Sequence, residues 1–163
     1  MKILMVCLGN ICRSPLAEGL LRREIDRAGL DWEVSSGGTA GYHVGNPPDP
    51  RSIAVAAAHG LDISAQRSHQ VTRADLEAYD LVFGMDRQNV ADLKQLARTQ
   101  VRGGGTTSDE NIRLYLDYTG LRETDGPDVF DPYYDDDGFA GVYDLLERAA
   151  KRAVASIREE DDL

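Results

Sequence analysis

Residues 7–13 read Cys-Leu-Gly-Asn-Ile-Cys-Arg, which places a thiol and a guanidinium at the two ends of one short loop. The preceding residues 3–6 form a short, apolar and partly β-branched run, which is typical of a buried parallel strand. Ser14 is a favoured N-cap residue, Pro15 fits the first position of a helix, and the apolar residues that follow recur at helical spacing. The sequence therefore predicts a strand that leads into the loop and a helix that begins directly after it.

Such a loop is suited to binding a phosphate group and attacking it. The start of a helix offers unpaired backbone N–H groups and a partial positive charge, which bind an anion. Arg13 adds a planar, two-pronged contact to phosphate oxygens, and a positive environment favours the nucleophilic thiolate form of Cys7. Gly9 and Asn10 tolerate the left-handed backbone that a loop with inward N–H groups requires.

Strand and helix signals alternate along the chain, which is the pattern of a parallel sheet with crossover helices. Strands are expected at residues 3–6, 32–36, 81–85 and 112–116, and helices at residues 14–28, 50–60, from 73, 86–97 and 139–157. This order predicts a small doubly wound α/β fold in which a four-stranded parallel sheet carries helices on both faces. The expected strand order is the flavodoxin-like 2-1-3-4, with residues 1–163 as a single domain. In such folds ligands bind beyond the carboxyl ends of the strands, where the loop at residues 7–13 lies.

Composition narrows the class of protein. The chain has 163 residues and a net charge of −10, which argues against nucleic acid and anionic membranes as partners. Its two cysteines both lie in the loop, so they indicate chemistry in a reducing compartment rather than a disulfide framework. No apolar run approaches the ~20 residues of a membrane span. We therefore expect a cytoplasmic monomer.

The string from Val6 to Pro15 closely resembles the phosphate-binding loop of the low-molecular-weight protein tyrosine phosphatases, and the resemblance covers nearly the whole chain. It implies hydrolysis of phosphotyrosine through a cysteinyl-phosphate intermediate, without a metal or organic cofactor. Cys7 would be the nucleophile and Arg13 the phosphate clamp. The remaining loop residues would bind the substrate, namely Leu8, Gly9, Asn10, Ile11, Cys12 and Ser14.

Residues 129–134 read Val-Phe-Asp-Pro-Tyr-Tyr and resemble the general-acid loop of the same family. By that match Asp131 donates a proton to the phenolate leaving group, and then accepts one from the water that attacks the intermediate. The alternative is an ordinary turn, because Asp-Pro is a common turn dipeptide. The resemblance therefore predicts Asp131 as the third catalytic residue.

Further positions carry over from the resemblance. Leu8, Tyr42 and Tyr133 match the mouth of the cleft, where aromatic rings accept a phenyl group by stacking. Tyr42 could equally be an ordinary loop residue. Ser36 matches a serine that braces Asn10, whereas Ala65 stands where many members have a histidine, so the bracing must differ. The stretch at residues 102–109 is polar and rich in glycine, which favours a mobile loop, and it has no assigned role.

The substrate and two rival functions stay open. A tyrosine-phosphorylated protein is expected, with a tyrosine autokinase as one candidate and an arginine-phosphorylated protein or a host protein as others. A thiol-dependent arsenate reductase shares the loop but needs further cysteines, and none follows Cys12. A non-catalytic phosphate-binding or phosphocarrier module would have no use for Asp131.

Cys12 suggests control by oxidation. It lies close to Cys7 in a curled loop, so the two sulfur atoms are expected within disulfide reach, which requires Cα atoms closer than ~7 Å. With the family resemblance, this predicts that Cys12 traps an oxidised Cys7 as a disulfide. The alternative is that Cys12 is only a small packing residue.

Overall fold

The computed structural model describes residues 1–99 and 105–161. Its centre is a four-stranded parallel sheet with strand order β2-β1-β3-β4, which confirms the predicted order. The strands are β1 (Lys2–Cys7), β2 (Glu33–Gly38), β3 (Leu81–Gly84) and β4 (Ile112–Leu114). All three pairings between neighbouring strands are parallel, so the carboxyl ends of the strands share one edge.

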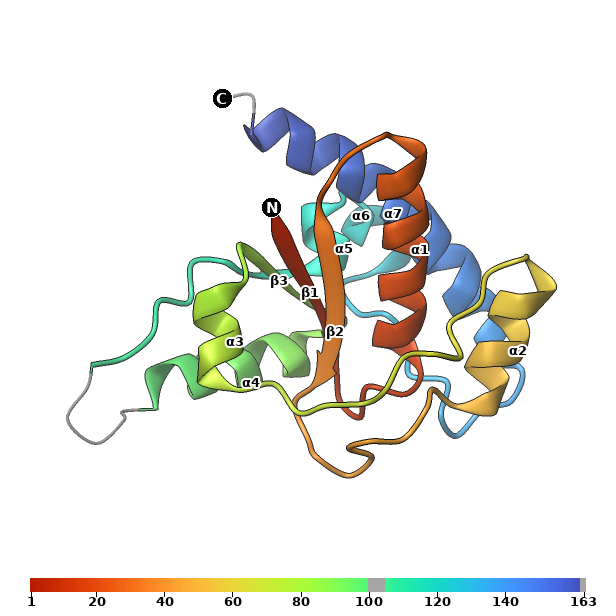
Figure 1. The fold of residues 1–163 in the computed structure, drawn as a ribbon, viewed down its shortest axis with the longest axis horizontal. Coiled ribbons are helices and arrows are strands. Elements are labelled where there is room, and N and C mark those ends of the chain that lie inside the picture. The colour runs from red at the N-terminus through yellow and green to blue at the C-terminus, as the bar shows by residue number, and fades with distance from the viewer. Residues whose placement is uncertain (100–104, 162–163) are drawn as a thin grey trace.

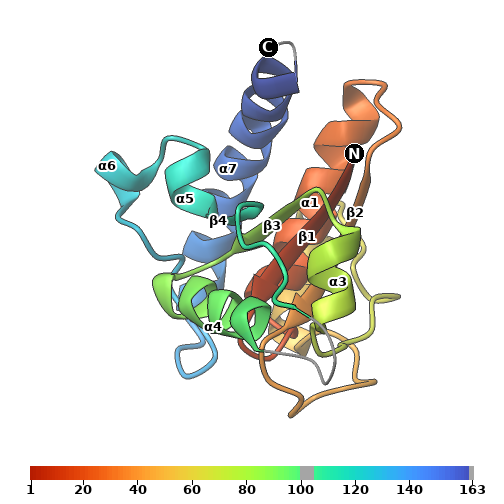
Figure 2. The same cartoon turned by 90° about the vertical axis from the view of Figure 1, so that its left-hand side faces the viewer.

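Helices cover both faces of the sheet, as predicted (Figure 1). They are α1 (Arg13–Arg27), α2 (Pro50–Ala58), α3 (Arg73–Ala78), α4 (Arg87–Arg98), α5 (Tyr115–Tyr118), α6 (Arg122–Asp125) and α7 (Gly138–Asp161). Figure 2, seen from the side, places α3 and α4 on one face and α1 and α7 on the other. Within the described residues, no helix is long and apolar enough to cross a membrane.

The alternating side chains of β1 explain why helices cover both faces of the sheet. Ile3 and Met5 belong to the core shared with α1 and α7, whereas Leu4 and Val6 belong to the core shared with α3 and α4. All four side chains are fully buried. A strand buried on both faces reads as a continuous apolar run, which is why it could be recognised in the sequence.

Several predicted element ends differ from the structure, and for two of them the contacts show the physical reason. The fourth strand ends at Leu114 rather than at residue 116, because Tyr115 begins α5 and packs its ring 5.0 Å from that of Phe83. The N-cap of α1 is Cys12, and Ser14 lies inside the helix. The Ser14 hydroxyl contacts Cys7 instead, so a side chain suited to capping serves the loop.

The glycine-rich stretch at residues 102–109 falls only partly within the structure. Residues 102–104 lie outside the described residues, whereas residues 105–109 form neither helix nor strand, as predicted. Arg73 donates hydrogen bonds to the Gly105 carbonyl and the Thr107 hydroxyl, at 2.9 and 3.1 Å. Residues 105–109 lie away from the carboxyl edge of β1 in Figure 1.

Candidate active site

Three loops meet at the carboxyl edge of the sheet (Figure 1). Their side chains line a cavity of about 320 Å³. The three loops are the phosphate loop (residues 7–13), the loop after β2 and the loop that carries Asp131. The cavity is lined by Cys7, Leu8, Gly9, Ile11, Cys12, Arg13, Tyr42, His43, Asp131, Tyr133 and Tyr134. The predicted nucleophile, phosphate clamp and general acid therefore share one cavity. Most of the predicted substrate-binding residues line it too.

The carbonyl groups of the phosphate loop point outward, toward neighbouring segments of the protein. Five of its carbonyl oxygens accept hydrogen bonds from neighbouring segments: Cys7 from Thr39, Leu8 from Ala40, Gly9 from Ser68, Ile11 from Asp49, and Cys12 from Ser52. Among the described residues, no group accepts a hydrogen bond from the backbone N–H of residues 8–12. Asn10 has a φ of 56°, in the left-handed region as predicted. The loop therefore leaves a row of N–H donors for an anion.

Gly9 serves a different purpose from the one predicted, because its backbone is not left-handed. A Cβ atom at this position would lie 3.0 Å from Cδ2 of His43, tighter than most contacts of that kind. Glycine is needed here because a neighbouring side chain approaches closely.

A buried chain of polar side chains fixes the loop from beneath. The Sγ of Cys7 lies 3.0 Å from the Oγ of Ser14, and Asn10 donates from Nδ2 to Ser14 and to Ser36 at 2.8 and 2.9 Å. Ser36 in turn donates to Glu18 at 2.9 Å. Burial raises the pKa of Glu18, although the Ser36 hydrogen bond opposes the shift. The predicted contact between Asn10 and Ser36 is confirmed, while Glu18 was not predicted.

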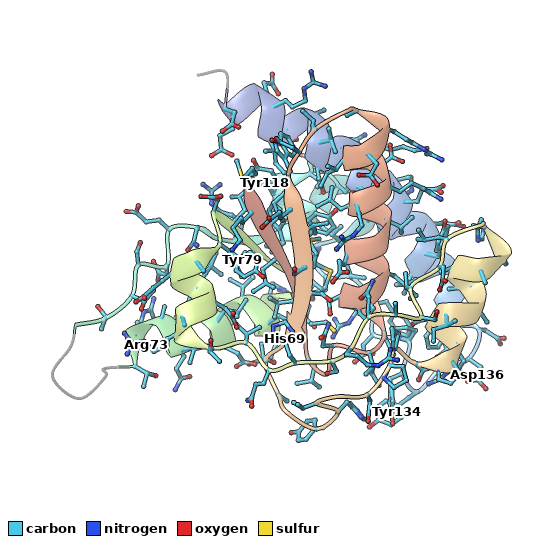
Figure 3. The ribbon with its side chains drawn as sticks, in the orientation of Figure 1. His69, Arg73, Tyr79, Tyr118, Tyr134 and Asp136 are labelled. Carbon is cyan, nitrogen blue, oxygen red and sulfur yellow. The ribbon has the colours of Figure 1, made fainter. Side chains whose placement is uncertain are left out.

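His69 supplies the remaining support through its backbone. Its N–H donates to Oδ1 of Asn10 at 3.1 Å, whereas its side chain points elsewhere, with Nε2 3.9 Å from Asp75. Figure 3 labels His69 beside the lower end of β2. Ala65 is exposed. The sequence could not show this contact, because any residue with an N–H group could make it.

Arg13 is almost completely buried, with 3% of its side chain exposed, and its guanidinium is held at several points. Its Nη1 donates to Asp86 at 2.7 Å and to the Val129 carbonyl at 3.1 Å, and its Nη2 lies 3.6 Å from Asp131. Burial alone would lower the pKa of Arg13, but Cys7 and the two carboxylates raise it above its ordinary value. The guanidinium therefore stays charged and fixed in orientation.

Asp86 is a site residue that the sequence analysis did not identify. It is the N-cap of α4 and accepts a hydrogen bond from the backbone of Asn89 at 2.7 Å, while its other carboxylate oxygen binds Arg13. Its position directly after β3 was a usable signal, since parallel strands end at the same edge of the sheet.

Asp131 faces the phosphate loop from an exposed segment. Its side chain is 42% exposed, and its Oδ1 accepts a hydrogen bond from the backbone N–H of Tyr133 at 3.1 Å. The Asp-Pro dipeptide is therefore part of a local turn and, at the same time, faces Arg13. The turn and the catalytic interpretation do not exclude each other.

Aromatic side chains surround the mouth of the cavity. Tyr42, Tyr133 and Tyr134 are exposed, and His43 lies between the first two, with ring centroids 6.5 Å from Tyr42 and 6.4 Å from Tyr133. The exposed side chain of Leu8 adds an apolar surface. Figure 3 shows Tyr134 projecting at this end of the molecule. His43 was not predicted, because a single histidine in a glycine-rich loop carries no distinguishing pattern.

Both cysteines are buried and have free thiols. Cys12 packs with Ile11 and Phe139. Burial, with smaller contributions from Asp49 and Cys7, raises the pKa of Cys12 to about 12, so this thiol is protonated at neutral pH. Among the described residues, no group of three or more His, Cys, Asp or Glu is arranged to hold a metal ion.

Known proteins are similar to this chain in sequence and in fold. The family model described as "Low molecular weight phosphotyrosine protein phosphatase" matches residues 2–163. The low-molecular-weight protein-tyrosine-phosphatase YfkJ of Bacillus subtilis is 34% identical, over 99% of this chain and 98% of its own. Its crystal structure has a TM-score of 0.87, at 32% identity over 98% of this chain and 96% of that one.

Two further solved structures extend the comparison. The protein tyrosine phosphatase of Entamoeba histolytica, solved with HEPES in its active site, has a TM-score of 0.85 and 32% identity over 99% of both chains. Wzb of Vibrio vulnificus, in complex with benzylphosphonate, has a TM-score of 0.78 and 29% identity, over 96% of this chain and 97% of its own. This chain belongs to the low-molecular-weight phosphotyrosine protein phosphatase family.

Proposed function

We propose that this protein tyrosine phosphatase works through a cysteinyl-phosphate intermediate, with Cys7 as nucleophile, Arg13 as phosphate clamp and Asp131 as general acid and then base. The observation that carries the proposal is the arrangement of the cavity. A thiol lies within a row of unused N–H donors, beside a fixed guanidinium and opposite a carboxyl group. Each of these groups meets one requirement of phosphoryl transfer to a thiolate.

The first step transfers the phosphoryl group to the enzyme. The Cys7 thiolate attacks phosphorus in line with the leaving phenolate oxygen, so an S–P bond forms as the P–O bond breaks. Asp131 donates its proton to that oxygen and becomes a carboxylate. The N–H groups of the loop and Arg13 stabilise the charge on the other phosphate oxygens.

The second step regenerates the enzyme. Water attacks phosphorus, its proton passes to the Asp131 carboxylate, and the S–P bond breaks to release inorganic phosphate and the Cys7 thiolate. Ser14 is placed to stabilise that thiolate, since its hydroxyl lies 3.0 Å from Sγ. The same carboxyl group thus acts in both steps.

The mouth of the cavity favours phosphotyrosine in a protein. The exposed Tyr42 and Tyr133 rings line the cavity and offer stacking surfaces for the phenyl group of phosphotyrosine. Benzylphosphonate, found in the Vibrio vulnificus relative, likewise carries an aromatic ring beside a phosphorus group. We propose a tyrosine-phosphorylated protein as substrate, and a tyrosine autokinase is one candidate.

We further propose that residues 1–163 act as one catalytic domain, as a monomer in the cytoplasm. The two free thiols at the site support a reducing compartment, because the nucleophile must stay reduced to react.

The proposal is tested by trapping the intermediate. The wild-type protein and a Cys12→Ser control should become phosphorylated on Cys7 when quenched during turnover of an aryl phosphate, whereas Cys7→Ser should lose more than 99% of turnover. Cys7→Ser should still bind vanadate or phosphate, since the row of backbone N–H donors in the phosphate loop remains. Turnover by Cys7→Ser above one hundredth of the wild-type rate would contradict the nucleophile assignment.

A further inference from the structure

Arg51 lies at the junction of the phosphate loop and the loop that carries Asp131. We propose that Arg51 is a positioning residue that holds the Asp131 loop over the phosphate loop. The inference rests on the proposed function of Asp131, and Arg51 itself touches no reacting atom.

On one side, the start of α2 is fastened to the phosphate loop. The backbone N–H of Asp49 donates to the Ile11 carbonyl at 2.8 Å, and the Ser52 hydroxyl donates to the Cys12 carbonyl at 3.3 Å. Asp49 is also the N-cap of α2 and accepts from the backbone of Arg51 at 2.9 Å. The first turn of α2 is therefore a fixed extension of the phosphate loop.

On the other side, the guanidinium of Arg51 reaches the Asp131 loop. It binds both carboxylate oxygens of Asp49, from Nε at 3.0 Å and from Nη2 at 2.9 Å, which sets the plane of the fork. Its remaining donors reach the Tyr133 carbonyl at 3.0 Å and Asp136 at 2.6 Å. It also stacks 4.6 Å from the ring centroid of Phe139. Figure 3 places Asp136 below α2.

Tyr133 connects Arg51 to the proposed general acid. Its carbonyl accepts from Arg51, and its N–H donates to Oδ1 of Asp131 at 3.1 Å. The direct approach of Asp131 to Arg13 is longer, at 3.6 Å. The position of the Asp131 carboxyl therefore depends on how Arg51 holds the backbone of Tyr133. A displacement of about 1 Å at a reacting group can cost up to about a hundredfold in rate.

This role is separable from folding. Asp136 is 84% exposed and Arg51 is one third exposed, so the ion pair between them contributes little to stability. Arg51 lies in the first turn of α2, whose capping contact comes from the Asp49 side chain to a backbone N–H and does not need the guanidinium. A variant at this position should therefore fold, so that its catalytic rate can be measured.

The test compares Arg51→Gln with Arg51→Lys and with the control Asp136→Asn, which removes only the exposed charge. The readout is kcat/KM over aryl phosphates of increasing leaving-group pKa, because this ratio reports steps up to P–O cleavage. Arg51→Gln should lower it about tenfold for phenyl phosphate and less than threefold for p-nitrophenyl phosphate, since only the former needs full protonation. Arg51→Lys should recover part of the loss. Asp136→Asn should change it less than twofold, and vanadate inhibition should be unchanged throughout.

A double variant separates this inference from the proposed function. If Arg51 acts through Asp131, Arg51→Gln should slow Asp131→Ala by less than twofold, because the two losses are not additive. Equal losses for all leaving groups, or additive losses in the double variant, would overturn the positioning role while leaving the function of Asp131 intact. If Asp131→Ala itself has no dependence on the leaving group, the proposed function fails instead.

Discussion

The phosphate loop and the Asp131 loop face each other across one cavity and are held in opposite ways. Cys7, Asn10 and Arg13 are at most 3% exposed, and five carbonyl groups of their loop accept hydrogen bonds. Asp131 and Tyr133 are about two fifths exposed, in a segment without helix or strand. The phosphate loop binds the phosphate group, which every substrate has in common, and it is preorganised by these contacts. The Asp131 loop meets the rest of the substrate, which varies, and it is held by fewer contacts.

The largest effect should come from the fixed loop. Arg13→Lys should reduce kcat/KM about a hundredfold or more, because an ammonium cannot replace the planar fork that meets Asp86 and the phosphate. Steady-state kinetics with p-nitrophenyl phosphate measures the loss. The matched control is Arg27→Lys, at an exposed end of the same helix, which should keep wild-type activity. Comparable rates for the two variants would show that charge alone suffices.

The exposed loop should give a loss that depends on the substrate. Asp131→Ala should lower kcat/KM about a hundredfold for phenyl phosphate and much less for aryl phosphates with good leaving groups, since general-acid catalysis contributes where the leaving oxygen needs a proton. Asp137→Ala, an exposed neighbour, is the control. A uniform loss across the series would make Asp131 structural and would remove the contrast between the two loops.

The polar chain beneath the fixed loop should matter more for stability than for chemistry. Ser36→Ala removes a partner from both Asn10 and Glu18, and a buried polar group left without its partner costs about 1–3 kcal/mol. Urea unfolding should show that loss, whereas Ser35→Ala, at the next position on β2, should stay within about 0.5 kcal/mol of wild type. An unchanged unfolding free energy for Ser36→Ala would mean that the loop needs no support from below.

Cys12 should have the smallest effect on turnover and a specific effect on recovery from oxidation. Peroxide converts the Cys7 thiolate to a sulfenic acid, and attack by the Cys12 thiolate would form a disulfide and release water. The wild type should then regain activity in dithiothreitol, whereas Cys12→Ser should proceed to the irreversible sulfinic acid.

The pH dependence of this trapping reaction follows from the pKa of Cys12. Because that pKa is about 12, the thiolate fraction of Cys12 grows with rising pH throughout the neutral range. Disulfide formation should therefore accelerate by up to about tenfold per pH unit, and mass spectrometry of quenched samples would follow it. Equal recovery of wild type and Cys12→Ser would show that Cys12 does not protect the nucleophile.

The sequence identified residues that belong to recognisable strings and missed several that only the fold brings to the site. Cys7 and Arg13 belong to one short string between a strand and a helix, so local rules and a family resemblance were enough to identify them. Asp86, His43 and Arg51 come from three separate loops and helix ends. Each has an ordinary local function, as a helix cap, a loop residue or a surface charge, and only the fold brings it to the cavity.

Local rules also failed where a long-range contact took precedence. Ser14 has the features of an N-cap, but its hydroxyl is used by Cys7 and Asn10, and the N-cap of α1 lies two residues earlier, at Cys12. Tyr115 continues a strand-like pattern, but its ring packs against Phe83 in the first turn of a helix. In both cases the tertiary partner outweighs the intrinsic preference of the residue.

The outward carbonyl groups of the phosphate loop have a consequence for biosynthesis. Their donors are Thr39, Ala40, Asp49, Ser52 and Ser68, all of which follow the loop in the chain. A nascent chain that ends after α1 therefore carries the thiol of Cys7 and the guanidinium of Arg13 but lacks the hydrogen bonds that shape the phosphate loop. The full set of hydrogen bonds that shapes the phosphate loop can form only after at least the first 68 residues have been made, because Ser68 is the last of these donors in the chain.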